Sequence, residues 1–237
     1  MNMIQKAATN MLLNYIVDDP LEKMPKIIEL AEKLDRGNIH ATQIKAVRDV
    51  LSDENNVWYT FVKNLVQEVD KKLIKKFVEC FIINANFQGY ARGREIEQKY
   101  DCNVPWAILM DPTSACNLSC TGCWAAQYGS KHNLSYETLD SICRQGKELG
   151  IYFYIFSGGE PLVRKKDIIR LCEAHQDCYF FAFTNGTLVD DELCEDMLRV
   201  GNFALAFSIE GDEEATDMRR GKGTYRKVIE AMERMKA

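Results

Sequence analysis

Apolar residues recur at helical spacing through the first hundred positions of the chain. They form four successive stripes, at residues 12–17, 27–34, 44–51 and 57–84. Gly37 is expected to cap the second of these helices, and Gly89 and Gly93 are expected to break the segment after the fourth. The pattern predicts an all-helical N-terminal region over residues 1–103, in which no set of catalytic side chains stands out.

Beyond residue 103, short apolar runs alternate with amphipathic stretches. The apolar runs predict strands at residues 106–110, 151–156, 178–183 and 203–209. The amphipathic stretches predict helices at residues 136–149, 166–175, 190–200 and 224–236. Strands that alternate with helices of this length indicate βα units and a parallel sheet, so we expect an α/β region over residues 104–237.

This second region holds about four βα units, whereas a standard closed barrel needs about eight. Either the sheet is open, or the chain is a piece of a longer protein. The strands are continuously apolar, which fits a sheet that is covered on both faces or the wall of a barrel.

Composition excludes some classes of protein. The formal net charge of -5 argues against nucleic acid or an anionic membrane as the main partner. No apolar window is long enough to span a membrane, and the N-terminus lacks a secretory pattern. We therefore expect a cytoplasmic protein, whose nine cysteines stay reduced. Cys143, Cys172 and Cys194 sit beside apolar residues in predicted helices and are interpreted as core residues.

Three cysteines, Cys116, Cys120 and Cys123, lie within eight residues directly after the first predicted strand. Thiolates on one short loop can converge on one metal centre, and three protein ligands on a four-iron cluster leave one iron open. The spacing therefore favours a [4Fe–4S] cluster. Structural zinc is the alternative, with His132 or Cys102 as a fourth ligand, although zinc sites usually pair two C-x2-C halves.

Polar motifs also follow the other three strands. Ser157-Gly-Gly-Glu-Pro161 follows the second, and its Gly158 and Gly159 would let a ligand approach the backbone, with Glu160 beside it. Asn185 follows the third strand and offers both a donor and an acceptor. Each motif alone is equally typical of an ordinary turn. Their common position at strand C-terminal ends, where ligands bind in parallel sheets, favours a binding site.

Ser208 and Glu210 end the fourth strand and face the same way in an extended chain, an arrangement that suits a ribose diol. Arg219 and Arg220 follow, and a guanidinium there can pair with a ligand carboxylate. A surface carboxylate and an exposed arginine pair in a loop are the alternative interpretations.

The order of these motifs resembles the radical S-adenosylmethionine (radical SAM) superfamily. The resemblance rests on C-x3-C-x2-C, Gly-Gly-Glu-Pro and Ser-x-Glu after strands one, two and four, and covers residues 104–237. It implies a partial (β/α) barrel of parallel strands preceded by the helical region. It also implies two cofactors, a [4Fe–4S] cluster and S-adenosylmethionine, with reductive cleavage of the latter to a 5′-deoxyadenosyl radical that acts on a substrate. An electron donor such as flavodoxin or ferredoxin is then a partner.

The resemblance assigns roles to the motif residues. Cys116, Cys120 and Cys123 would hold the cluster and be catalytic. The residues that would contact S-adenosylmethionine are Gly158, Gly159, Glu160, Asn185, Ser208, Glu210, Arg219 and Arg220. Gly158 to Glu160 would meet its ammonium group, Ser208 and Glu210 its ribose, and one of the arginines its carboxylate.

Two features depart from the superfamily pattern. The aromatic residue usually found just before the third cysteine is replaced by Gly122, and Trp124 follows that cysteine instead. Family barrels have six βα units, and only four are present here. The sequence therefore leaves three functions open: an active enzyme of unknown substrate, a truncated fragment that binds the cluster or S-adenosylmethionine without catalysis, and a zinc-stabilised α/β binding module.

Overall fold

A computed structural model of the chain describes residues 39–236, together with residues 23, 25, 26, 28, 29, 31, 32 and 35. The chain divides into two compact units, residues 1–79 and 80–237. The apolar stripe expected at residues 12–17 and the cap expected at Gly37 lie outside the described residues. The domain boundary expected after residue 103 stays a prediction.

The described part of the first unit contains the helices α3 (Ala41–Leu51), α4 (Val57–Glu68) and α5 (Lys71–Phe77). The stripe at residues 57–84 is thus divided, because Val69 is extended and the Asp70 side chain accepts a hydrogen bond from the Lys72 amide at 2.7 Å. An aspartate that caps the amide two residues on starts a new helix at that point. Within the described residues, this part of the chain is helical, as predicted.

The expected break at Gly89 and Gly93 is wrong. A π-helical segment (Val78–Gly89) runs directly into α6 (Tyr90–Tyr100). A Cβ atom on Gly89 would lie 2.2 Å from the carbonyl oxygen of Gly150, in the turn before the second strand. Gly89 is therefore explained by the close approach of two backbones inside the second unit, rather than by the end of a helix.

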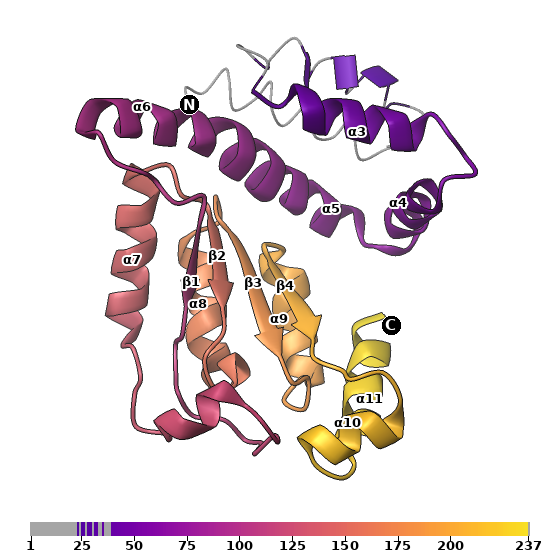
Figure 1. Ribbon diagram of the computed structural model, residues 1–237, viewed down its shortest axis with the longest axis vertical. Helices are drawn as coiled ribbons and strands as arrows, with labels where there is room; N and C mark the ends of the chain where they lie inside the picture. Colours follow the sequence, from indigo (N-terminus) through magenta and orange to yellow (C-terminus); the bar gives the residue numbers. More distant parts are fainter. Residues whose placement is uncertain are drawn as a thin grey trace. The chain divides into compact units, whose positions relative to one another are not determined.

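The sheet consists of β1 (Ala107–Met110), β2 (Phe153–Phe156), β3 (Tyr179–Thr184) and β4 (Phe203–Phe207). All neighbouring pairs are parallel, and the strands lie in sequence order, so the described sheet is open (Figure 1). The helices that follow the four strands are α7 (Tyr136–Glu148), α8 (Lys165–Ala174), α9 (Asp191–Val200) and α11 (Thr224–Lys236). The predicted fold class, a partial α/β barrel after a helical region, is confirmed.

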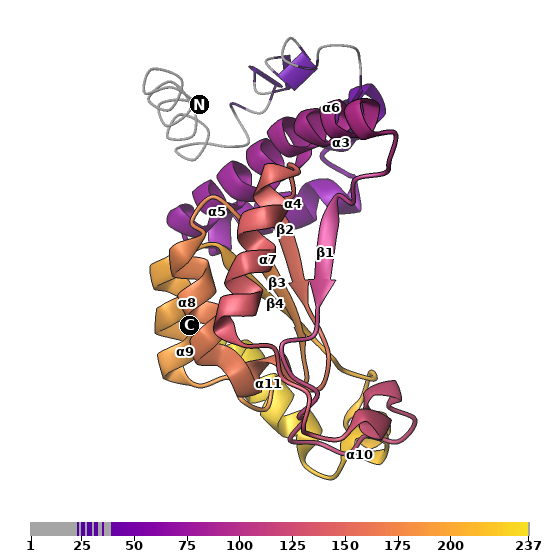
Figure 2. The same cartoon turned by 90° about the vertical axis from the view of Figure 1, so that its left-hand side faces the viewer.

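Helices α7, α8 and α9 lie on one side of the sheet (Figure 2), and the hydrophobic core forms between these helices and the sheet. Tyr154 and Phe156 of β2 and Phe180 of β3 point to that side and are fully buried. Cys143 and Cys172 are buried in the same core, as predicted, and Cys194 is partly buried. Burying these large side chains is the main force that holds the strands in register.

The opposite face of the sheet is only partly covered. Phe81 of the π-helical segment packs edge-on against Phe153, with ring centroids 5.0 Å apart. Nearer the C-terminal ends of the strands, Leu109 and Phe183 are 58% and 47% exposed. The sheet therefore presents an open apolar surface on this side. It differs in this respect from a parallel sheet that is covered by helices on both faces.

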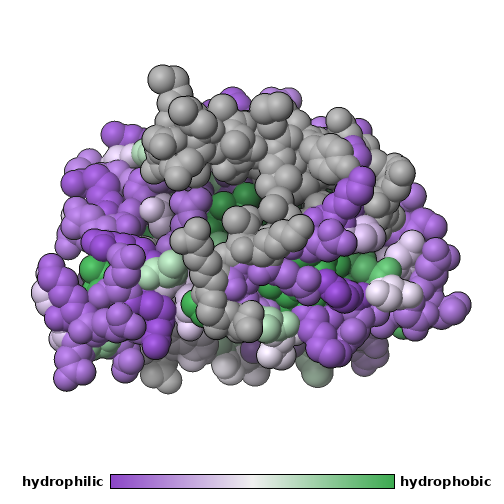
Figure 3. All heavy atoms as spheres, turned by 90° about the horizontal axis from the view of Figure 1, so that it is seen from above, coloured by the Kyte–Doolittle hydropathy of each residue, from purple (hydrophilic) through white to green (hydrophobic). Residues whose placement is uncertain are grey.

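Most of the coloured residues on the face drawn in Figure 3 are hydrophilic, in keeping with a chain that is 27% charged. Within the described residues, every helix is too short or too polar to cross a membrane.

Candidate functional site

The predicted motifs converge at the C-terminal ends of the four strands (Figure 1). Residues 111–134, here called the cysteine loop, connect β1 to α7 and contain a short 3-10 helix, Trp124–Tyr128. An antiparallel bridge between Thr113 and Asn133 closes the base of the loop. At its far side, the Thr121 amide donates to the carbonyl oxygen of Arg219 at 2.8 Å. The loop is therefore held at its base and again near its middle, at Thr121.

Cys116 is exposed, whereas Cys120 and Cys123 are partly buried. Desolvation raises the pKa of the Cys116 thiol, the Leu118 amide opposes this by donating to its sulfur, and the negative charges of Glu160, Cys120 and Cys123 raise it further. Cys120 and Cys123 thus both lie within electrostatic reach of Cys116. Holding three thiolates together is costly until a cationic centre neutralises them.

Among the described residues, no three Cys, His, Asp or Glu side chains are gathered tightly enough to hold a single metal ion. Cysteines that bind a four-iron cluster need not lie this close together, because each thiolate binds a different iron. Cys102, one of the possible zinc ligands, precedes β1 and so lies at the opposite end of that strand from Cys116. Cys102 is therefore ruled out as a fourth zinc ligand, and three thiols are the donor set that leaves one iron of a four-iron cluster open.

Gly158 and Gly159 allow a close approach, as expected, but the approaching group is the protein's own backbone. The Gly159 and Glu160 amides donate to the carbonyl oxygens of Thr113 and Ala115, at 2.9 and 2.8 Å. A Cβ atom on Gly159 would lie 2.2 Å from the Ala115 oxygen. The glycines thus attach the turn after β2 to the residues that immediately precede Cys116.

The Glu160 carboxylate is 1% exposed and lies between two strand ends. Its Oε1 accepts hydrogen bonds from the Leu162 amide (3.0 Å) and the Thr184 hydroxyl (2.7 Å), and its Oε2 accepts one from the Asn185 amide (2.8 Å). Burial raises the pKa of Glu160, and these three donors oppose the rise. The carboxylate therefore joins the ends of β2 and β3, a function that the sequence motif did not reveal.

Asn185 is also buried, at 6% exposure, and faces the cysteine loop. Its Nδ2 donates to Oδ1 of Asn117 at 2.9 Å and to Sγ of Cys116 at 3.9 Å. Asn117 and Thr187, which complete this contact, were not singled out in the sequence. In the sequence, only their positions beside predicted motifs indicate that Asn117 and Thr187 belong to the site.

Glu210 and the two arginines come together as well. Oε1 of Glu210 accepts from Nη1 of Arg219 (2.6 Å) and from Nε and Nη2 of Arg220 (2.8 and 2.6 Å). The contact with Arg220, followed by that with Arg219, lowers the pKa of Glu210. Ser208 begins the same segment, where its amide donates to the Thr184 carbonyl oxygen at 2.9 Å.

The arginines do not lie in a loop. They end a helix, α10 (Glu213–Arg220), which the sequence analysis missed. Its signals are present: the Asp212 side chain caps the Ala215 amide at 2.8 Å, and acidic residues in the first turn precede basic residues in the last. The C-terminal end of α10 therefore places both guanidinium groups against the Glu210 carboxylate.

A cavity of about 530 Å3 opens beside the cysteine loop. Gly158, Gly159 and Trp124 are among the residues that line it, and Trp124 is 59% exposed. Asp111, the first residue after β1, also lines the cavity, and burial raises its pKa. The cavity therefore offers space for a small molecule between the cysteine loop and the turn after β2, although none of the three cysteines lines it.

A model of the radical SAM superfamily matches residues 110–237. The chain belongs to the radical SAM superfamily. The match covers more than half of the chain and includes every residue of the site described above, so the sequence-based assignment is confirmed.

Relatives of this radical SAM protein are longer than the chain. It is 33% identical to an uncharacterised protein of Archaeoglobus fulgidus over 196 residues, 81% of this chain and 43% of that protein. It is 32% identical to the Fe-coproporphyrin III synthase of Methanosarcina barkeri over 123 residues, 50% of this chain and 31% of the enzyme. The chain thus spans less than half the length of either relative.

A solved structure shares the fold. Streptococcus suis SuiB bound to S-adenosylmethionine superposes with a TM-score of 0.50 at 22% identity, covering 61% of this chain and 34% of that one. The likeness supports the arrangement of the radical SAM core.

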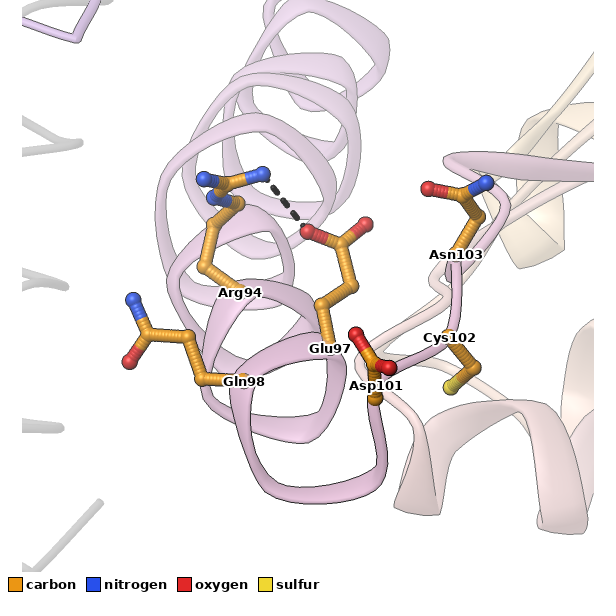
Figure 4. Close-up of a pocket in the computed structure, with 6 residues that line it drawn as sticks. All are labelled: Arg94, Glu97, Gln98, Asp101, Cys102 and Asn103. Atoms are coloured by element: carbon orange, nitrogen blue, oxygen red, sulfur yellow. Dashed lines mark hydrogen bonds and ion pairs between the residues drawn. The ribbon is translucent and has the colours of Figure 1, made fainter.

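A second hollow, of about 420 Å3, lies away from the radical SAM site. Figure 4 shows it between the end of α6, where Arg94 and Glu97 form an ion pair at 2.7 Å, and Cys102 and Asn103. These last two residues precede β1, so the hollow is at the N-terminal end of that strand. Ligands of parallel sheets bind at the other end.

Proposed function

We propose that this protein is a radical SAM enzyme that holds a [4Fe–4S] cluster on Cys116, Cys120 and Cys123 and reductively cleaves S-adenosylmethionine. The observation that carries the proposal is the attachment of the cysteine loop to both the Gly-Gly-Glu turn and Asn185 at the strand ends. A reduced cluster would supply one electron that breaks the sulfur–C5′ bond, giving methionine and a 5′-deoxyadenosyl radical. The protein binds and orients the reactants.

The Gly-Gly-Glu turn suits the methionine ammonium group. Gly158 and Gly159 line the cavity beside the cysteine loop, so a ligand bound there would lie close to their backbone polar groups. The Glu160 carboxylate already accepts three hydrogen bonds from the chain. Its negative charge still attracts a cation over a short distance, so we assign it a supporting electrostatic role.

The segment after β4 suits the ribose and the methionine carboxylate. The three arginine contacts to Glu210 all use Oε1, and within the described residues no hydrogen bond to Oε2 is present. Oε2 and the Ser208 hydroxyl are thus available to a ribose diol. Arg219 and Arg220 supply the positive charge that a carboxylate needs, with Arg220 the more buried of the two.

Reduced cysteines and an iron–sulfur centre fit a reducing compartment, so we expect the protein to act in the cytoplasm with flavodoxin or ferredoxin as electron donor. The substrate is a separate partner. We propose residues 1–103 as a helical region distinct from the radical SAM core. A non-catalytic fragment that binds the cofactors is the second candidate, because the chain spans less than half of its relatives.

The test is anaerobic reconstitution with iron and sulfide, reduction with dithionite, addition of S-adenosylmethionine, and measurement of 5′-deoxyadenosine. We expect formation in the wild type and in Cys102→Ala, a matched control whose exposed thiol lies outside the cysteine loop. Cys120→Ala should lose both the [4Fe–4S] signal and the product. A wild type that shows the signal but no product supports the non-catalytic candidate, and stoichiometric zinc without sulfide contradicts both.

A further inference from the structure

Three side chains form a closed ring of hydrogen bonds beside Cys116. Asn185 Nδ2 donates to Asn117 Oδ1 at 2.9 Å, and Asn117 Nδ2 donates to Thr187 Oγ1 at 2.7 Å. The Thr187 hydroxyl completes the ring by donating to Asn185 Oδ1 at 2.7 Å. Asn117 directly follows Cys116 in the sequence, so the ring attaches the start of the cysteine loop to the turn after β3.

The orientation of Asn185 follows from a backbone contact. The Thr187 amide can only donate, and it lies 3.0 Å from the oxygen assigned as Oδ1. Nδ2 is therefore the atom that faces Asn117 and the Cys116 sulfur. An asparagine side chain has two donor hydrogens and two acceptor lone pairs, and all four of those of Asn185 face groups of the protein, the longest contact being 3.9 Å to the Cys116 sulfur.

Cys116 is thus attached on both sides. The Gly159 and Glu160 amides hold the carbonyl oxygens of Thr113 and Ala115 before it, and the ring holds Asn117 after it. Glu160 also accepts from the Asn185 amide, which connects the two attachments. A ligand loop that is already ordered loses less conformational entropy when its metal centre binds.

We propose that Asn185 is a positioning residue for Cys116. Through the ring it orders the start of the cysteine loop before the cluster binds, and its second Nδ2–H donates to the Cys116 sulfur. This inference rests on the proposed function, because it assigns Asn185 to the cluster ligand rather than to S-adenosylmethionine. Hydrogen bonds to ligand sulfurs stabilise the reduced, more negative cluster, so Asn185 raises the reduction potential.

Two variants separate the ring from the sulfur contact. Asn185→Leu has a similar shape and removes both. Thr187→Val removes the two ring bonds made by the Thr187 hydroxyl. It keeps the bond from the backbone amide of residue 187 to Asn185 and the contact of Asn185 Nδ2 with the Cys116 sulfur. Asn86→Leu is the matched control, because it removes an asparagine hydrogen bond, to the Phe81 carbonyl oxygen, outside the site. Thermal unfolding of each cluster-free protein verifies folding.

The first measurement is hydrogen exchange of the cluster-free protein. Peptides covering residues 114–120 should exchange roughly three- to tenfold faster in Asn185→Leu and Thr187→Val, the change that loss of one net hydrogen bond produces. Peptides of α9 should be unchanged, and Asn86→Leu should match the wild type at residues 114–120. Equal exchange in the wild type and Asn185→Leu overturns the ordering role.

The second measurement is the midpoint potential of the reconstituted cluster, followed by electron paramagnetic resonance. It should become more negative in Asn185→Leu, with a smaller change in Thr187→Val. An unchanged potential in Asn185→Leu overturns the sulfur contact. A wild type that assembles no [4Fe–4S] cluster contradicts the proposed function instead, and the exchange measurement still decides whether the ring orders the loop.

Discussion

Oε2 of Glu160 accepts a hydrogen bond from the backbone amide of Asn185 at 2.8 Å, which joins the turn after β2 to the turn after β3. The two residues are 25 positions apart in sequence and belong to different motifs. Because Asn185 also contacts the cysteine loop, three strand ends are connected through this one bond. The site is therefore a single hydrogen-bonded unit, and changes at its centre should affect stability as well as function.

Glu160→Gln should destabilise the protein by about 1–3 kcal/mol, because an amide group would face three donors with only one acceptor atom. The free energy of unfolding, from urea denaturation of the cluster-free protein, measures this effect. Glu195→Gln, on the exposed side of α9, is the control and should change it by less than about 0.5 kcal/mol. Equal effects of the two substitutions would contradict the joining role of Glu160.

Gly159→Ala should cost about 1–3 kcal/mol, since the new methyl group would meet the backbone oxygen of Ala115 and neither backbone can move freely. Gly93→Ala is the matched control. Its methyl group would make ordinary contact with Val104 at 3.6 Å inside α6, where alanine is favoured over glycine by about 0.5–1 kcal/mol. Opposite signs in urea denaturation are the expected outcome, and a neutral Gly159→Ala is the outcome that contradicts the close approach.

His175 predicts a pH dependence. Its side chain is 3% exposed, its Nε2 lies 2.9 Å from Oδ1 of Asp140, and its buried Nδ1 has no hydrogen-bond partner among the described residues. Burial lowers its pKa despite the favourable contact with Asp140, and Lys147 lowers it further, while Asp177 opposes this.

The unfolded chain therefore takes up this proton at a higher pH than the folded protein. Stability should be fully present above the ordinary histidine pKa of 6.5 and should fall as the pH drops below it. Urea denaturation from pH 7.5 to 5.5 measures the slope. His175→Gln keeps a donor for Asp140 and should flatten the slope in this window; an unaltered slope would assign it to other groups.

Arg220→Gln should weaken S-adenosylmethionine binding by about tenfold, the loss expected for one hydrogen bond to a charged group. Calorimetric titration of the reconstituted, oxidised protein measures the dissociation constant. Arg226→Gln is the control, because Arg226 pairs with Glu213 on the exposed side of the same region. Unchanged binding in Arg220→Gln would indicate that Arg220 serves Glu210 alone.

Much of the core was predictable. The four strands, their parallel arrangement and the position of the motifs at their C-terminal ends follow from alternating apolar runs and helices, and the structure agrees to within two residues at each strand end. Helix α10 was missed because its apolar stripe is weak, although its caps are visible in the sequence. Gly89 was interpreted as a helix breaker because the backbone that approaches it, at Gly150, is distant in sequence.

The sequence by itself determined which candidate functional side chains the chain carries: three cysteines on one loop, and polar residues after the other three strands. This is possible because residue type, spacing and hydrophobic period are local properties. Only the tertiary structure decided which polar groups remain available to a ligand. Glu160 and Asn185 both belong to predicted motifs, yet their side chains are taken up by hydrogen bonds to Leu162, Thr184 and Thr187 and to the cysteine loop. Those bonds depend on the lateral packing of β1, β2 and β3, which brings distant turns together and which no local pattern encodes.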